Sequence, residues 1–284
     1  MNILIANVGN CRRAELRELA LALNEHHKVT VATMSEDRAF RAQAFTLSHA
    51  PTRMAQIPFD GKIDAYEFYT HPADATSIML GGVMRHERPD LVICGFSNGT
   101  HMGSDIYVSS NIGMATEATY FGVPAIAIGV ARRVGGHTKH TLKPAIQWVV
   151  EYLHKLTELE IPPRTLLNVN IPHAETYDDI KGVRVTSMGN LSAHYDFIEK
   201  TDPDGRKYYW GDIKPRTKRE TDTDTDAYWF DKGYVSVTPI NYDATHHESV
   251  EHWGGVIKEI IKEAKIVGDS IALPDNFGGE EGGK

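Results

Sequence analysis

The chain opens with an apolar run, a polar loop and an amphipathic stretch. Residues 2–6 are apolar enough for a buried strand, and residues 7–11, Asn-Val-Gly-Asn-Cys, predict a loop. Residues 12–25 place Leu16, Leu19, Ala20 and Leu23 on one face of a helix, and Lys28–Thr33 predicts the next strand. This order of strand, loop, helix and strand is typical of the start of a doubly wound α/β fold.

Two further apolar runs, residues 90–94 and 123–130, enclose a loop rich in Gly, Asn and Ser and a helix-like segment. A strand, a helix and a second strand of these lengths predict a βαβ unit in a parallel sheet. Ligands of such sheets bind beyond the carboxyl ends of the strands, so we expect the chemistry in the loop 95–105. Helices are also predicted at 72–86 and 144–158, and a strand at 166–172.

The pattern changes after Pro172. Residues 195–245 are rich in aromatic, Asp and Thr residues with Gly and Pro turns, and helical periodicity returns only at His246–Val267. The fold class is therefore α/β, a Rossmann-like and mostly parallel sheet flanked by helices, with an antiparallel hairpin extension towards the C-terminus. We predict a single domain over residues 1–270, with its parallel core at about 1–172 and its hairpin part at about 173–270, and a flexible tail at 271–284.

Composition narrows the class of ligand. The 284 residues include 38 acidic and 30 basic side chains, which give a net charge of −8, and no stripe of Lys or Arg stands out. A nucleic-acid partner is therefore disfavoured, and a small-molecule substrate is expected. Neither a membrane span nor a leader segment is predicted, and the two cysteines, Cys11 and Cys94, suit a reducing compartment, so we expect a cytoplasmic protein.

Several motifs along the chain resemble those of one family. They are Thr70-His71-Pro72-Ala73-Asp74, the core segment Pro89–Val130, Leu167-Asn168-Val169-Asn170-Ile171-Pro172, the run from Asp202 to Trp210, and Gly233-Tyr234-Val235-Ser236-Val237-Thr238-Pro239. Together they resemble the SurE family, the metal-dependent survival-protein nucleotidases, over roughly residues 1–250. The resemblance implies a phosphomonoesterase or nucleotidase. It also implies a homodimer or homotetramer, formed through an extended hairpin at about 195–225 and a C-terminal helix at about 247–268.

The resemblance also implies where a metal would bind. In the family, two aspartates after the first strand, a serine after the second strand and an asparagine of the core motif hold a divalent ion. Those positions fall on Val8, Gly9, about Ala39 and Ser97 in this chain, so all four family ligands are replaced. Magnesium and manganese prefer hard oxygen ligands that include carboxylates. We therefore predict no cofactor and no metal-ligating residue, with Mg²⁺ or Mn²⁺ bound only by a rearranged ligand set.

Three functional hypotheses remain open. The first keeps the family's phosphatase chemistry. The second is a metal-independent hydrolase or lyase in which His101 acts as acid or base and Cys11 or Ser109 as nucleophile, because an unperturbed histidine titrates near neutrality. The third is a relative that binds a ligand without catalysis. The predicted substrate-binding residues are Asn7, Gly9, Asn10, Arg12, Ser97, Asn98 and Gly99.

The loop 7–11 is also predicted to lie at a helix N-terminus, where backbone N–H groups and the helix dipole favour anions. Arg12 and Arg13 follow this loop directly and strengthen that interpretation. The alternative is that both arginines are solvated residues of the first helical turn.

Overall fold

The structure is a computed structural model that describes residues 1–46, 50–131, 142–190, 194–214, 221–260, 266–267 and 270–271. It divides into two units, Met1–Tyr242 and Asp243–Lys284. The second unit contains the helix α6 (His247–Ile260) and the short antiparallel strands β12 (Ile266–Val267) and β13 (Ser270–Ile271). The tail predicted at 271–284 lies outside the described residues except for Ile271.

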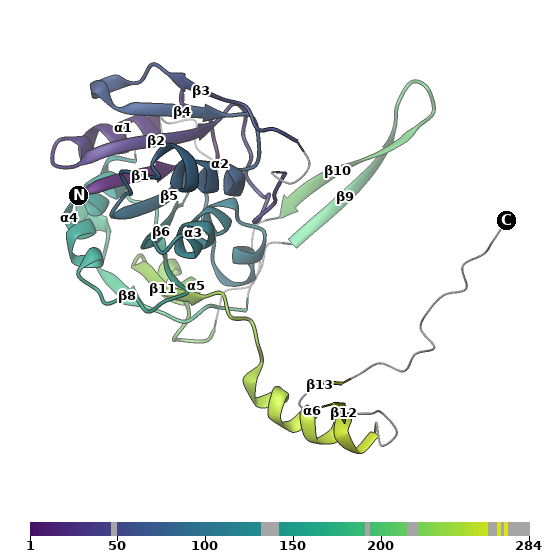
Figure 1. Cartoon of the computed structure of the whole chain (residues 1–284). Coiled ribbons are helices and arrows are strands. Elements are labelled where there is room, and N and C mark those ends of the chain that lie inside the picture. The colour runs from purple at the N-terminus through teal and green to yellow at the C-terminus, as the bar shows by residue number, and fades with distance from the viewer. Residues whose placement is uncertain are drawn as a thin grey trace. The chain divides into compact units, whose positions relative to one another are not determined.

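A nine-stranded sheet forms the first unit (Figure 1). Its strands follow one another in the order β3 (Met54–Ile57), β4 (Asp64–Phe68), β2 (Lys28–Met34), β1 (Asn2–Ala6), β5 (Leu91–Asn98), β6 (Ala125–Val130), β7 (Thr165–Ile171), β11 (Val235–Asn241) and β8 (Val183–Val185). Most neighbouring pairs are parallel, and the antiparallel pairs are β3 with β4 and β7 with β11. The predicted α/β class with a mostly parallel sheet is confirmed.

The sheet reverses its winding direction beside β1. The chain passes from β1 to β2 on one side and later returns to place β5 on the other side of β1. In open α/β sheets a crevice forms at such a reversal, beyond the carboxyl ends of the two strands. We therefore expect a ligand to bind at the loops that follow β1 and β5.

Alternating side chains of the central strands enter two separate cores, as the two-residue period of a strand requires. Ile3 and Ile5 pack with α1 (Ala14–Asn24) and α4 (Lys143–Thr157) on one face. Leu4 and Ala6 pack with α2 (Pro72–Ile78) and α3 (Ser110–Tyr120) on the other. The leucines predicted for the inner face of the first helix, Leu16, Leu19 and Leu23, are buried there.

The predicted helix at 72–86 is shorter than expected. The α-helix α2 stops at Ile78 and continues as a π-helical turn, η2 (Met79–Val83), which contains Gly81 and Gly82. Glycine is a poor helix former because its backbone loses the most conformational freedom on folding. Gly81 also leaves room for the Phe121 ring, which a Cβ atom at position 81 would approach to 3.2 Å.

Shorter elements complete the first unit. They are the turns η1 (Asp60–Lys62), η3 (Gly103–Tyr107) and η4 (Tyr177–Asp179), the helix α5 (Asp226–Asp231), and a hairpin of β9 (His194–Thr201) and β10 (Lys207–Lys214). The Asp202 carboxylate closes the hairpin turn by accepting from the amides of Asp204 and Arg206 at 2.9 and 2.8 Å. No helix within the described ranges is long and apolar enough to span a membrane.

Candidate active site

The side chain of Asn7 joins the carboxyl ends of β1 and β5. Its amide nitrogen Nδ2 donates to the carbonyl of Gly95 at 2.8 Å, and its Oδ1 accepts from the amide of Gly9 at the same distance. Asn7 is only 1% exposed, so these bonds replace contacts that water would otherwise supply. Asn7 therefore folds the loop 7–9 into a fixed turn at the winding reversal of the sheet.

The next two residues provide no side-chain oxygen. The Val8 side chain is buried and joins the apolar core beneath α2 and α3. Gly9 has no side chain, and Arg13 fills the space beside it: a Cβ atom at Gly9 would lie 2.2 Å from Arg13 Nε and 2.6 Å from its Cδ. Gly9 is not among the glycines with positive φ, so glycine here leaves space for the Arg13 side chain and is not required by the backbone conformation.

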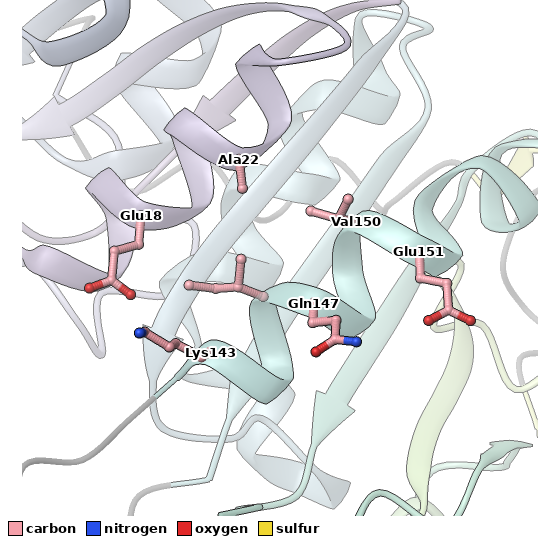
Figure 2. Close-up of a pocket in the computed structure, with 7 residues that line it drawn as sticks. Glu18, Ala22, Lys143, Gln147, Val150 and Glu151 are labelled. Carbon is pink, nitrogen blue, oxygen red and sulfur yellow. The ribbon is translucent and has the colours of Figure 1, made fainter. Parts of the chain in front are cut away.

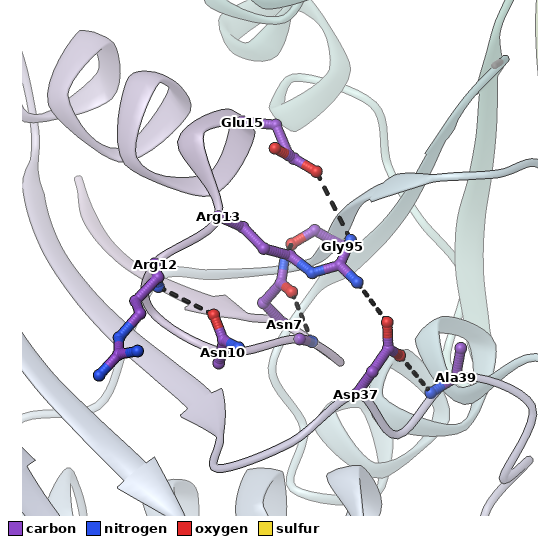
Figure 3. A network of polar contacts seen from close by, with 9 residues as sticks. Asn7, Asn10, Arg12, Arg13, Glu15, Asp37, Ala39 and Gly95 are labelled. Carbon is purple, nitrogen blue, oxygen red and sulfur yellow. Dashed lines mark hydrogen bonds and ion pairs between the residues drawn. The ribbon is translucent and has the colours of Figure 1, made fainter. Parts of the chain in front are cut away.

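Arg13 forms ion pairs on two sides of the loop (Figure 3). Its Nη2 pairs with the Asp37 carboxylate from the loop after β2, and its Nη1 lies 3.5 Å from Glu15 in the first turn of α1. Asp37 is held in turn, because its Oδ1 accepts from the amide of Ala39 at 3.0 Å. The Arg13 side chain is 31% exposed, so the cation lies at the surface of the crevice rather than in the core.

The loop after β2 is fixed both to the loop 7–9 and to the start of α3. The amides of Met34 and Arg38 donate to the carbonyls of Gly9 and Val8 at 3.1 and 2.9 Å. On the other side, Ser110 Oγ donates to the Arg38 carbonyl at 2.8 Å and accepts from the Arg41 amide at 2.9 Å. Three segments that are distant in sequence thus meet at one edge of the sheet.

His101 lies inside a cluster of asparagines instead of in the open crevice. Its Nδ1 lies 2.6 Å from Asn168 Oδ1, its backbone amide donates to Asn170 Oδ1 at 2.9 Å, and Asn168 Nδ2 donates back to its carbonyl at 2.8 Å. The side chain is 3% exposed, and burial lowers its pKa to about 4, against the opposing effect of the bond to Asn168. The ring is therefore neutral at neutral pH, and it ties the loop after β5 to β7.

A buried carboxylate fixes the same loop a second time. Asp226, at the start of α5, is fully buried and accepts from the amides of Gly103, Gly189 and Ala227 at 2.9, 3.1 and 2.7 Å. Three backbone donors from separate segments thus converge on one side chain. His101 and Asp226 together set the path of the chain between β5 and α3.

The other predicted residues are spread around the crevice. Ser109 is the N-cap of α3, and its Oγ accepts from the Ile112 amide at 3.4 Å. Cys11 is partly exposed, and Asn10 Oδ1 accepts from the Arg12 amide at 3.0 Å while the Arg12 side chain points to solvent. Ser97 and Asn98 end β5, and Gly99 bridges to Val130. The roles predicted for these residues and for His101 stay predictions.

Sequence reasoning missed the contacts that fix these loops. Both Arg12 and Arg13 were expected beside the loop 7–11, and it is the Arg13 side chain that covers Gly9. Asn168, Asn170 and Asp226 stood out only as parts of family-like motifs, and their shared contact with the loop 99–103 depends on partners 67 to 123 residues away. The signal that was available was the polar character of Asn168 and Asn170 between the apolar residues of a buried strand.

The donor set after β1 does not fit a divalent cation of the magnesium type. Such ions need several hard oxygen ligands, and Val8 and Gly9 contribute no side-chain oxygen. The carboxylates of Asp37 and Glu15, which lie beside this loop, are both paired with Arg13. Within the part of the chain that the structure describes, no three His, Cys, Asp or Glu side chains are grouped so that they could hold a metal ion.

A separate shallow groove lies between α1 and α4, which cover one face of the sheet (Figure 2). Ala22, Ile146 and Val150 form its apolar part, and Glu18 and Lys143 lie at its edge. Glu18, Lys143, Gln147 and Glu151 also line the groove, but it lies on the helix surface and away from the carboxyl ends of β1 and β5. The crevice at the winding reversal is therefore the better candidate for the active site.

Comparisons with known proteins find similar sequences and a similar solved structure. The family model described as survival protein SurE matches residues 3–194. A 5'-nucleotidase SurE from Thermoanaerobacter sp. (strain X514) is 32% identical over 252 residues, which cover 88% of this chain and 96% of that protein. One from Pelotomaculum thermopropionicum is 30% identical over 268 residues, covering 94% and 98%. The crystal structure of the Aquifex aeolicus SurE protein superposes with a TM-score of 0.74 at 26% identity, covering 92% of this chain and 99% of that one.

Proposed function

The chain belongs to the SurE family, and we propose that it hydrolyses phosphate monoesters, with nucleoside monophosphates as the first substrate class to test. Relatives that match 88% or more of this chain are named 5'-nucleotidases, which supports a hydrolase. The observation that carries the proposal is the meeting of three loops, after β1, β2 and β5, at the winding reversal of the sheet.

This crevice suits the phosphoryl end of such an ester. The N-terminus of α1 follows the loop 7–11, and the N-terminus of α3 lies where Ser110 meets the loop after β2. Helix N-termini favour anions because their first N–H groups lack intrahelical acceptors and carry the positive end of the helix dipole. We propose that Asn7, Gly9, Asn10 and Arg12 line the phosphoryl end, and that Ser97, Asn98 and Gly99 face the rest of the ester.

We also propose roles in the chemical step for Ser109, Cys11 and His101. Ser109 and Cys11 are both partly exposed beside the crevice, which suits a nucleophile. His101 is proposed as the acid or base, but a substrate would reach its buried ring only after the loop 99–103 had moved. A second candidate function is binding of a phosphate ester without hydrolysis, and it is favoured by the missing carboxylates at positions 8 and 9.

Phosphate release from a panel of nucleoside monophosphates and an aryl phosphate, measured with Mn²⁺, with Mg²⁺ and with EDTA, tests the proposal. Release above the rate of a Ser109→Ala and Cys11→Ala double variant supports hydrolysis at this crevice. Binding of the same compounds without release would favour the non-catalytic candidate. Neither release nor binding under any of the three conditions would refute both.

We further propose that the chain assembles as a homodimer or homotetramer through the β9–β10 hairpin. Several large apolar side chains of this hairpin are exposed to a degree that is unusual for a monomer, including Phe197 at 69%, Tyr209 at 60% and Trp210 at 63%. A second copy of the chain would remove these side chains from water. The hydrophobic gain from such burial favours association.

A further inference from the structure

We propose that the guanidinium group of Arg13 is an anion-binding cation of this crevice, and that it takes the place of the divalent ion that the SurE resemblance places after β1. The inference rests on the proposed function, because its ligand is the dianionic phosphoryl group of a phosphate monoester. A side chain of the protein then supplies the positive charge that offsets the charge of the phosphoryl group.

The first support is the space that Arg13 fills. The Arg13 side chain lies directly against Gly9, where any larger residue would collide with it at 2.2 Å. The resemblance places the second metal-ligating aspartate of the family at position 9. Glycine at position 9 therefore leaves the space that the cationic side chain of Arg13 fills.

The second support is that the loop 7–9, which lies against Arg13, carries no negative charge. Val8 and Gly9 are neutral, so no carboxylate on the loop 7–9 repels a phosphoryl group. Arg13 is a permanent cation with five N–H donors in a planar fork that matches the oxygen atoms of a phosphate. The two ion pairs of Arg13 use its Nη1 and Nη2 atoms, each of which carries two hydrogens, and its side chain is 31% exposed.

The third support is Asp37, whose carboxylate pairs with Arg13. The Asp37 side chain is 53% exposed, so its pair with Arg13 lies in contact with solvent and is weak in the way surface ion pairs are. A phosphoryl dianion carries more charge than one carboxylate and can displace Asp37 from Arg13. Asp37 therefore competes with the ligand for the same cation, and removing its charge should strengthen binding.

The test is titration calorimetry of the full chain with inorganic phosphate and with adenosine 5'-monophosphate, in buffer containing EDTA. Wild type should bind both, and Arg13→Gln should raise Kd about 10- to 100-fold, the range expected for a lost hydrogen bond to a charged group. Asp37→Asn keeps the Oδ1 acceptor for Ala39 and should lower Kd at least about threefold. Gly9→Ala should weaken binding in the same direction as Arg13→Gln, because its Cβ atom displaces the guanidinium group.

Lys28→Gln is the matched control. It removes one positive charge from an exposed pair with Glu87, at the start of β2 and thus at the opposite edge of the sheet, and should leave Kd unchanged. Binding that needs Mn²⁺ and survives Arg13→Gln would overturn the inference while leaving the phosphatase proposal intact. Wild type that binds neither compound, with or without Mn²⁺, would overturn the proposed function and the inference with it.

Discussion

Replacing Asp226 by alanine should loosen the candidate site more than any nearby surface change. The Asp226 carboxylate is fully buried and accepts three backbone N–H groups, from Gly103, Gly189 and Ala227. A buried donor that loses its acceptor costs about 1–3 kcal/mol. Counting the three donors near the lower end of that range, we expect Asp226→Ala to reduce the free energy of unfolding by about 3–5 kcal/mol, a large part of the roughly 5–15 kcal/mol of a typical domain.

Urea unfolding followed by circular dichroism and by tryptophan fluorescence measures this loss, and agreement of the two signals checks that a single transition is being observed. Asp224→Ala is the control, because the Asp224 side chain is exposed and its loss should change stability by no more than about 0.5 kcal/mol. Asp226→Asn retains one acceptor oxygen and should fall between the two. A loss below about 1 kcal/mol for Asp226→Ala would refute the idea that this carboxylate fixes the loop after β5.

A histidine in the unfolded chain has a pKa near 6.5, whereas burial lowers the pKa of His101 to about 4. As the pH falls, the unfolded chain therefore binds the proton first. The free energy of unfolding should drop by about 3 kcal/mol between about pH 6.5 and pH 4. Urea titrations of His101→Gln should lack this drop, and an unchanged profile would contradict the assignment. Val8→Asp with Gly9→Asp should raise Mn²⁺ affinity at least about tenfold when Arg13→Ala makes room, and no gain by calorimetry would mean that the loop 7–9 does not correspond to the family's metal loop. Trp210→Ser should shift the sedimentation coefficient towards that of a monomer, and a monomeric wild type would rule out hairpin assembly.

The parallel core was predictable because its signals are local. Apolar runs such as 123–130 and helical spacing such as Leu16, Leu19 and Leu23 fix the type of each element. The order of elements then limits the sheet to few topologies, and the reversal beside β1 follows from them. The helix end at Ile78 was missed because apolar spacing continued through the two glycines that disturb the backbone.

The candidate site was less predictable, because its contacts join segments that are far apart in sequence. Spacing placed both Arg12 and Arg13 beside the loop 7–11, but only the path of the chain into α1 decides which of them covers Gly9. His101 looked like an accessible acid or base. Its burial results from Asn168 and Asn170, which β7 brings to it from 67 and 69 residues away.

A crystal structure of the full chain grown with adenosine 5'-monophosphate and EDTA would test the central claim most directly. We predict that the phosphoryl group lies in the crevice after β1 and β5, within hydrogen-bond distance of the Arg13 guanidinium group, with Asp37 displaced from its present pair. A phosphoryl group bound elsewhere, or bound in this crevice while Arg13 remains paired with Asp37 and makes no contact with it, would contradict the account.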